Sequence, residues 1–542
     1  MPVLSVRNLV GAVVFAVLAG CGGGGGGGGG GTPTPPVVTG PTWTSGSFLA
    51  ASSFGNRCAA PRTGVDAQGQ AFPDIAGSLA QEMFFLRSWT HETYLWNTEV
   101  IDQNPGNFTD RVAYFNVLKT NQLTTNGQAK DRFHFNVLTA DYLAQVTSAP
   151  TASYGAEIRI FAPSVPRDVR VVFTDPNTPA SELLAGTPKL ARGAKLLVVD
   201  GIDVVNGGTS QAQVDILNNG TFPRTAGETH SFTVQYANGT TRAITLTSAN
   251  LVEPPVNRTA VLPTGTGNVG YILLNTFTPF VTEQQLVNAI ASLKTQGVND
   301  VVLDLRYNGG GLLALSSQLS YMIAGPTRTA GKVFERLRFN NGTTGNDPVT
   351  GQANTPTPFY STGLGFSVAP NTPIQTLDLP RVYVLSTAAT CSASESVING
   401  LRGADVDVVL IGSKTCGKPF GFYAEDNCGM TYFSIQFQGI NNKDFGDYPD
   451  GFAAANSPQP LPVKIPGCAV ADDFSHELGD PTEAMLAAAL NHRATGTCPA
   501  VSGSGLSPQA VRTDGIPMAS GRSPAAEFLR NNRDLRMPPV SQ

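Results

Sequence analysis

The feature that most constrains the fold is a series of largely apolar segments that alternate with helical patterns between residues 268 and 495. The segments 298–305, 382–385 and 406–411 lack the strict apolar–polar alternation of a strand with one wet face. The segment 283–296, which directly precedes the first of them, has apolar residues at helical spacing. Apolar strands separated by helices indicate a sheet that is covered on both faces. We therefore predict an α/β core over residues 251–498.

Two regions of different character precede this core. Residues 45–150 carry apolar side chains at helical spacing, such as Leu79, Met83 and Leu86, and are predicted to form a helical N-terminal domain. Residues 151–250 alternate apolar and polar side chains, which is typical of strands, and are predicted to form a compact β domain. The predicted fold class is therefore mixed, with helical, β and α/β parts, followed by a weakly ordered tail over 499–542.

The first 44 residues have the composition of export and anchoring segments. An apolar run at 9–19 follows Arg7 and ends in Leu18-Ala19-Gly20-Cys21, as in a secretory signal peptide over 1–20. The last four of these residues resemble a bacterial lipobox, which implies a lipid on the Cys21 thiol. The alternative is an ordinary signal peptide with an incidental cysteine. The Gly- and Pro-rich stretch 21–44 is predicted to be a tether.

These features predict an envelope lipoprotein that is attached to a membrane by its lipid. Gly22, rather than Asp, follows the cysteine, and in the sorting rule that this resembles it favours the outer membrane, facing the periplasm or the cell surface. The formal net charge of -5 offers no electrostatic basis for binding nucleic acid, so no such partner is expected.

The cysteines agree with export. Apart from Cys21 the chain has six, and in an oxidising compartment they predict up to three disulfides. Cys416 and Cys428 flank a predicted strand turn, so we predict that they pair. The alternative is a zinc site, but no CxxC or HxxxH spacing supports it. Neither a metal nor a cofactor is predicted.

Two short segments offer candidate catalytic groups. Cys391-Ser392-Ala393-Ser394-Glu395 lies at a predicted turn from strand to helix, and Thr415-Cys416-Gly417-Lys418 follows the next predicted strand. A serine hydroxyl needs a base, and a site for the charge that develops on the carbonyl oxygen, before it can attack an amide. None of the five histidines lies within these βα units. Lys418 is the candidate base, because apolar surroundings lower the pKa of a lysine from about 10.4.

At these residues the chain resembles the C-terminal processing peptidases, also called tail-specific proteases. Three motifs in order carry the resemblance, at 304–312, 392–395 and 412–418. The resemblance implies that Ser392 is the nucleophile and Lys418 the general base. It also implies that the amides of Gly310 and Ala393 form the oxyanion hole.

Some residues near these motifs have alternative readings. Ser394 and Cys391 compete with Ser392 as nucleophile, although a cysteine in an exported chain is more often bridged. Glu395 is expected to be a carboxylate of the first helical turn rather than an acid catalyst. Asp304 and Arg306 are expected to be structural and to close the end of a strand.

Residues 151–250 resemble a PDZ domain, on Thr178-Pro179-Ala180 and on the pattern over 190–201. The resemblance implies that Tyr154, Gly155 and Ala156 form the loop whose amides hold a peptide's terminal carboxylate, with the peptide added as an edge strand. The pattern departs from the family at Ala194, which stands where the family has an aspartate. An unrelated small β domain is the alternative.

The main hypothesis from the sequence is a serine endopeptidase that recognises the C-terminal tails of exported polypeptides. One departure from the peptidase pattern is Phe422, which stands where many members carry a glutamine that orients the lysine. A non-catalytic peptide-binding lipoprotein on the same scaffold is therefore the alternative, and a purely structural envelope protein is a third. The sequence makes no prediction of the oligomeric state.

Overall fold

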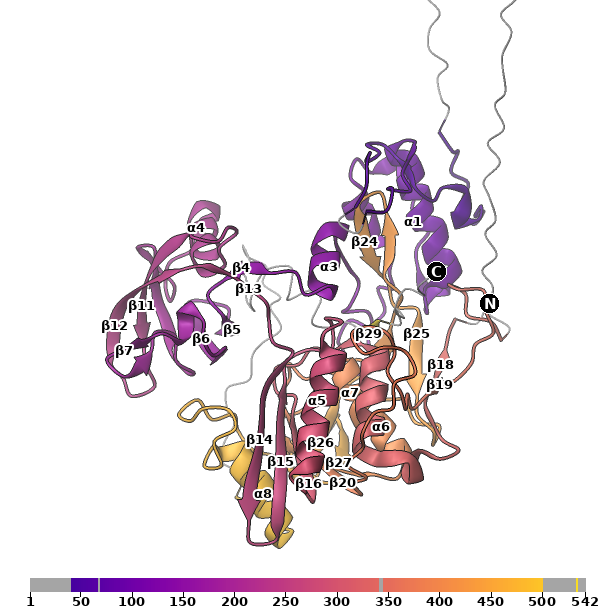
Figure 1. Cartoon of the computed structure of the whole chain (residues 1–542). Coiled ribbons are helices and arrows are strands. Elements are labelled where there is room, and N and C mark those ends of the chain that lie inside the picture. The colour runs from indigo at the N-terminus through magenta and orange to yellow at the C-terminus, as the bar shows by residue number, and fades with distance from the viewer. Residues whose placement is uncertain (1–39, 67–68, 341–344, 501–532, 535–542) are drawn as a thin grey trace, which may run out of the picture. The chain divides into compact units, whose positions relative to one another are not determined.

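The computed structural model of the chain describes residues 40–66, 69–340, 345–500 and 533–534 (Figure 1). The predicted signal peptide, the Cys21 lipidation site and most of the predicted tether and tail lie outside the described residues. Apart from Gly40, the described residues belong to one unit, Pro41–Gln542. No helix among the described residues combines the length and the apolar character needed to cross a bilayer.

A six-stranded sheet forms the centre of the predicted α/β core, in the order β14-β15-β16-β20-β21-β28. Its strands are β14 (Val256–Thr264), β15 (Gly267–Leu274), β16 (Asp300–Asp304), β20 (Arg381–Ser386), β21 (Asp407–Gly412) and β28 (Gly467–Cys468). The edge strand β14 is antiparallel to β15, and all other neighbours in this sheet are parallel. The mixed α/β architecture predicted from the sequence is confirmed.

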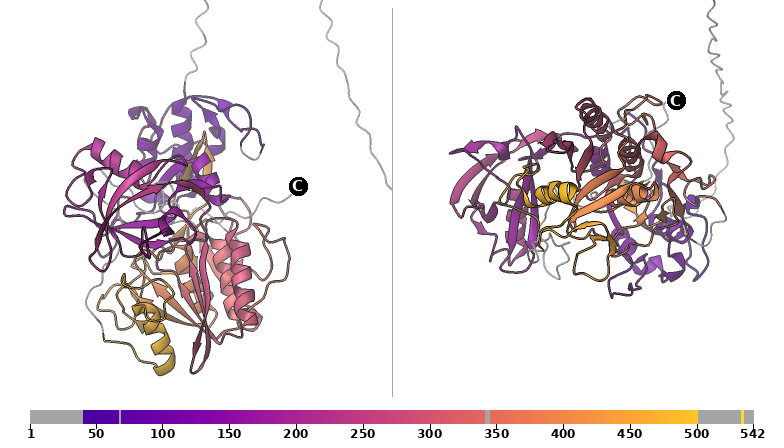
Figure 2. Two further views of the ribbon diagram at one scale, coloured as in Figure 1. Left: turned by 60° about the vertical axis from the view of Figure 1, so that its left-hand side comes forward. Right: turned by 90° about the horizontal axis from the view of Figure 1, so that it is seen from below.

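Helices cover both faces of this sheet, as the apolar strands require (Figures 1 and 2). The helices are α5 (Thr282–Thr295), α6 (Leu313–Thr329), α7 (Ala393–Gly403) and α8 (Ala484–Thr495). Leu303, Val384 and Leu410 point into one core cluster with α5, α6 and α7. Their neighbours along the strands, such as Leu385 and Ile411, point into a second cluster with α8. The predicted double cover is therefore confirmed.

Several shorter strands lie outside the six-stranded sheet. A four-stranded sheet has the order β19-β18-β25-β22. The short strands are β17 (Gly311–Leu312), β18 (Val333–Arg338), β19 (Thr357–Pro358), β22 (Phe420–Gly421), β25 (Phe437–Ile440), β26 (Phe452–Ala454), β27 (Val463–Ile465) and β29 (Arg533–Asp534).

The N-terminal region contains helices but also a strand that belongs to a sheet with the core. Its helices are α1 (Leu79–Thr93), α2 (Arg111–Val117) and α3 (Thr139–Val146). The N-terminus of α2 is capped by Asp110, whose Oδ1 accepts from the Ala113 amide at 2.7 Å. β3 (Phe135–Leu138) pairs with β24 (Met430–Phe433), which also pairs with β23 (Glu425–Asn427). The boundary at residue 150 stays a prediction, because this sheet spans it.

Residues 151–250 form a β unit with one helix. The main strands follow the order β12-β11-β9-β6-β5, with β10 on β9. The elements are β5 (Ala156–Ala162), β6 (Asp168–Thr174), β9 (Lys195–Val199), β10 (Ile202–Asp203), α4 (Gln211–Thr221), β11 (Thr229–Gln235) and β12 (Thr241–Thr247). β4 (Thr151–Ser153) pairs with β13 (Ala249–Leu251), which brings the two ends of the unit together.

Six cysteines form three disulfides, as the cysteine count predicted, but the one predicted pairing is wrong. The bridges are Cys58–Cys428, Cys391–Cys416 and Cys468–Cys498. Cys428 lies at the turn between β23 and β24, against the N-terminal region, rather than beside Cys416. The Cys416 amide instead donates to the Thr390 carbonyl at 3.0 Å, which places Cys416 next to Cys391.

Candidate active site

The three motifs singled out in the sequence follow three neighbouring parallel strands. β16 leads into the glycine turn at 308–311, β20 into the turn that carries Ser392, and β21 into the loop that carries Lys418. Because the carboxyl ends of parallel strands meet at one edge of a sheet, the fold brings all three turns to the same edge. This is the edge at which open α/β sheets place their ligands.

Ser392 occupies an unusual backbone conformation at the N-cap of α7. Its φ is 59° and its ψ is -113°, a region that residues with a side chain rarely adopt. Such conformations cost free energy and cluster at functional sites. The Ser392 hydroxyl is fully buried and has no hydrogen-bond partner among the described residues. It is therefore not hydrogen-bonded to Lys418 in this structure.

Lys418 is fully buried among aromatic side chains. Its Nζ lies 4.3 Å from the centroid of the Phe422 ring and 4.9 Å from that of Phe133. The apolar surroundings expected from the sequence around Lys418 are therefore present, and Phe422 fills the position expected for a glutamine. Phe133 comes from the N-terminal region, and nothing in the sequence pattern indicated that it would lie here.

The Glu395 carboxylate holds the backbone of the Ser392 turn and of the Lys418 loop together. It accepts from the amides of Ser392 at 3.0 Å, Gly417 at 2.9 Å and Lys418 at 2.7 Å. It also accepts from the Thr415 hydroxyl at 2.5 Å. Burial raises the pKa of Glu395 above its usual value, and these four donors act in the opposite direction. Glu395 is the first-turn carboxylate that the sequence predicted, and it also acts as a bridge between the two motifs.

A disulfide joins the same two motifs a second time. Cys391 precedes Ser392 directly, and Cys416 precedes Lys418 by two residues; their Cα atoms are 5.2 Å apart. The loop is also held from its other side, because the Thr415 amide donates to the Phe452 carbonyl at 2.9 Å. The disulfide and the hydrogen bonds of Glu395 thus link the turn that carries Ser392 to the loop that carries Lys418.

The two competing nucleophiles already have other partners. Cys391 is in the disulfide described above, as its alternative reading expected. The Ser394 hydroxyl donates to the Asn308 carbonyl at 3.0 Å. Among these three side chains, Ser392 alone presents a hydroxyl without a partner in the described part of the chain.

The proposed oxyanion donors differ in their surroundings. The Gly310 amide donates to Asn308 Oδ1 at 2.9 Å, so it is occupied in this structure. Ala393 is the first residue of α7, where amides have no partner within the helix, and it is buried. The role of both amides stays a prediction, and for Gly310 it requires the Asn308 side chain to turn away.

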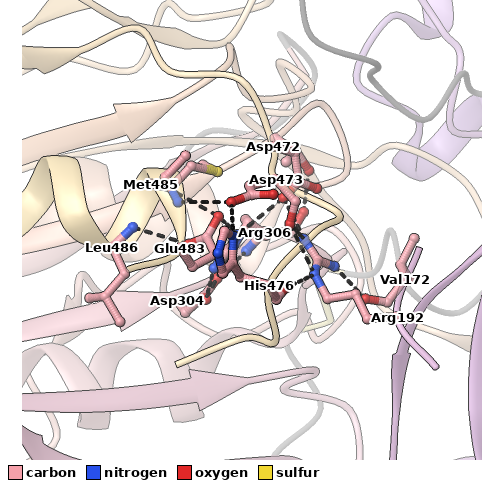
Figure 3. A network of polar contacts seen from close by, with 12 residues as sticks. Val172, Arg192, Asp304, Arg306, Asp472, Asp473, His476, Glu483, Met485 and Leu486 are labelled. Carbon is pink, nitrogen blue, oxygen red and sulfur yellow. Dashed lines mark hydrogen bonds and ion pairs between the residues drawn. The ribbon is translucent and has the colours of Figure 1, made fainter. Parts of the chain in front are cut away.

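The end of β16 is held by a buried network of charges (Figure 3). Arg306 is fully buried and donates to Asp304 through Nε at 3.0 Å and Nη2 at 2.7 Å. Its Nη1 donates to Asp472 at 3.0 Å and to Glu483 at 2.9 Å. Arg192 of the β unit donates to the same Asp472 at 2.7 Å. The expected structural role of Asp304 and Arg306 is confirmed.

The loop predicted to hold a peptide carboxylate is packed in this structure. Tyr154 is buried, and its hydroxyl donates to the Gly220 carbonyl at 3.1 Å. The Gly155 amide donates to the Ser153 hydroxyl oxygen at 3.0 Å. Ala156 lies in β5 opposite Thr174 of β6. The binding role of Tyr154, Gly155 and Ala156 stays a prediction.

Part of the chain is similar to known peptidases. The family model of Peptidase family S41 matches residues 268–421, which contain all three motifs. A carboxyl-terminal-processing protease of Picosynechococcus sp. is 28% identical over 263 residues, which are 47% of this chain and 55% of the relative. The chain thus spans about half the length of this curated relative.

One solved structure has a similar fold over most of both chains. A putative S41 protease from Bacteroides fragilis has a TM-score of 0.55 at 23% identity, over 79% of this chain and 99% of that one. A photosystem II D1 C-terminal processing protease has a TM-score of 0.40 at 19% identity, over 72% of this chain and 94% of that one.

Proposed function

Because residues 268–421 match the model of Peptidase family S41 and the chain is similar to a carboxyl-terminal-processing protease, we propose that this protein is a serine endopeptidase that cleaves exported polypeptides. The observation that carries the proposal is the pair Ser392 and Lys418. One is a buried hydroxyl on a strained turn, and the other is a buried amine in an aromatic pocket. Both are held by Glu395 and by the Cys391–Cys416 bridge.

The proposed reaction follows from these two groups. Uncharged Lys418 takes the proton of Ser392 as its oxygen attacks the carbonyl carbon of the scissile peptide bond. The negative charge that forms on the carbonyl oxygen is stabilised by the amides of Gly310 and Ala393 and by the positive end of α7. Lys418 then returns the proton to the leaving amine, and an acyl-Ser392 ester remains. Water hydrolyses this ester, with Lys418 again taking the proton.

The proposal also assigns functions to two regions outside the α/β core. The β unit would act as a PDZ domain that binds a substrate's C-terminal tail through the Tyr154-Gly155-Ala156 loop and pairs with it as an edge strand. A lipid on Cys21 would anchor the protein in the cell envelope, at the outer membrane. These assignments rest on the motifs of the sequence.

Two observations favour a second candidate function. Phe422 offers no hydrogen-bond acceptor to Lys418, and the Ser392 hydroxyl has no partner among the described residues. A scaffold with these features would bind peptides without cleaving them. The second candidate function is therefore that of a non-catalytic, peptide-binding envelope lipoprotein.

The test between these functions is covalent labelling of the nucleophile. We expect the purified full-length chain to degrade unfolded casein, and a fluorophosphonate probe to form an adduct on Ser392 that mass spectrometry maps. The probe reacts only with an activated serine, so a merely peptide-binding protein is not labelled. Casein that stays intact together with an unlabelled Ser392 would favour the second function, and an adduct on Ser394 would overturn the assignment of the nucleophile.

The disulfide beside the site gives a further expected result. Replacing both Cys391 and Cys416 by serine should lower kcat for peptide hydrolysis by about 100-fold, because small displacements of reacting groups have effects of this size. The matched control replaces Cys468 and Cys498, whose bridge spans 30 residues rather than 25. Both variants should lose roughly 3–4 kcal/mol of stability by the chain-entropy argument. Equal kcat values for the two double variants, with both proteins folded, would show that the Cys391–Cys416 bridge has no positioning role.

A further inference from the structure

The strand that follows the glycine turn has a partner from the far end of the chain. β17 pairs in parallel with β29, with Gly311 opposite Arg533 and Leu312 opposite Asp534. β17 begins directly after Gly310, the predicted oxyanion donor. β29 also lies beside β22, which begins two residues after Lys418. A segment that is remote in sequence therefore lies next to the motifs of both predicted catalytic groups.

The backbone of β17 explains why this position accepts an extended chain. The Phe277 amide donates to the Gly310 carbonyl at 2.8 Å, and the Leu312 amide donates to the Phe277 carbonyl at 3.2 Å. Successive residues of a strand direct their backbone groups to opposite sides. The amide and carbonyl of Gly311 therefore face the other side, which β29 occupies. Without β29 this side is a strand edge, and such edges bind extended polypeptides by adding a strand.

Gly311 is suited to this close approach on both sides. Its φ is 133°, and a Cβ at this position would lie 2.4 Å from the backbone of Phe277. A residue with a side chain would push β17 away from Phe277 and disturb the edge. Gly311 thus allows β17 to lie between Phe277 on one side and β29 on the other.

We propose that β29 (Arg533–Asp534), here called the tail segment, is an intramolecular ligand of the peptidase site, and that it occupies the strand edge at which a polypeptide substrate would lie. This inference rests on the proposed function, because it takes the edge beside Gly310 and Lys418 as the substrate site. The tail segment then competes with substrate and keeps the enzyme in a resting state.

The state of the site agrees with a resting enzyme. With β29 in place, the Ser392 hydroxyl has no partner among the described residues, and the Gly310 amide is occupied by Asn308. The predicted proton transfer and the predicted oxyanion hole are thus both incomplete while the tail segment is paired with β17. A substrate that displaces β29 would have to complete both.

The expected degree of inhibition follows from the covalent link between β29 and the rest of the chain. A covalently linked ligand acts at an effective concentration of about 1 mM. If the tail segment binds its edge with a dissociation constant of about 0.1 mM, it raises the apparent KM for a competing substrate roughly tenfold and leaves kcat unchanged.

The test changes one backbone donor in the full-length chain. In the parallel register, the amide able to donate to the Gly311 carbonyl is that of Asp534. Asp534→Pro removes this amide, and Ala525→Pro places the same change outside β29. We expect Asp534→Pro to lower the KM for casein-derived peptides about tenfold with unchanged kcat, and Ala525→Pro to behave as the unmodified chain. Equal KM values in all three proteins would overturn the proposal.

A binding measurement separates this inference from the proposed function. A fluorescent peptide of residues 525–542 should bind the Ser392→Ala/Asp534→Pro double variant in a polarisation assay, and unlabelled casein should displace it. This assay needs no catalysis. If the full-length chain hydrolyses nothing while the peptide still binds and casein displaces it, the peptidase proposal fails and the tail site stands. If the peptide does not bind, the tail proposal fails whether or not the enzyme is active.

Discussion

Replacing Ser392 by alanine, or Lys418 by methionine, is expected to lower kcat for peptide hydrolysis by about 10⁴-fold or more in a folded protein. The alanine removes the atom that attacks the substrate. The methionine removes the base but fills the same buried space between Phe422 and Phe133. Kinetics with a fluorogenic peptide, together with circular dichroism of each variant, measure the two effects separately.

The combination of the two changes tests whether they act as one unit. Because the serine and its base operate in the same step, the double variant should be no slower than either single variant. Lys418→Arg should be as inactive as Lys418→Met, since a guanidinium keeps its proton and cannot serve as a base. If Lys418→Arg is inactive, the role of Lys418 in catalysis is therefore proton transfer rather than the supply of a positive charge.

Two neighbouring residues supply matched controls. Lys414 lies in the same loop but is partly exposed, so Lys414→Met should leave kcat unchanged. Ser394 donates to the Asn308 carbonyl, so Ser394→Ala should lower stability by about 1 kcal/mol and leave most of the activity. Activity that survives Ser392→Ala but not Ser394→Ala would transfer the nucleophile to Ser394.

Features with a local signal in the sequence could be predicted. The strands β16, β20 and β21 could be predicted because each is a short apolar run followed by turn residues, and their order fixes the edge at which Ser392 and Lys418 meet. The role of Glu395 as a first-turn carboxylate could be predicted from its place three residues after the N-cap.

Features that depend on contacts between distant segments could not be predicted. Nothing near Phe133 marks it as a neighbour of Lys418, because the contact arises from the packing of the N-terminal region against the core. The pairing of Cys391 with Cys416 has the same origin, since spacing alone does not select one connectivity from several. The occupied Gly310 amide depends on a side-chain rotamer of Asn308, which no sequence pattern specifies.

The buried network around Arg306 offers an electrostatic test of stability. Asp304, Asp472 and Glu483 are carboxylates with little or no exposure, and all three contact Arg306. Burial alone lowers the pKa of Arg306, but these carboxylates together hold it well above its ordinary value. The two arginines, Arg192 and Arg306, in turn keep the pKa of Asp472 below its usual value despite burial. The cation and its partners therefore depend on each other for their charges.

Arg306→Met is expected to destabilise the protein by about 3–5 kcal/mol, because it leaves three buried carboxylates without their central cation. The apparent melting temperature should fall by roughly 3–5 °C, because the unfolding entropy of a chain of this size makes each 1 kcal/mol worth about 1 °C. Arg306→Lys should be almost as damaging, since one ammonium cannot reproduce the fork that contacts Asp304 through Nε and Nη2 and the other two through Nη1.

The control for this experiment is an arginine in an exposed ion pair. Arg336 pairs with Asp444, and their side chains are 39% and 86% exposed, so Arg336→Met should cost at most about 1 kcal/mol. Because Arg306 precedes the glycine turn by only two residues, its loss should also lower peptidase activity at temperatures below the melting transition. A variant that melts like the unmodified chain but has lost activity would show that Arg306 orders the turn at Gly310 rather than the fold as a whole.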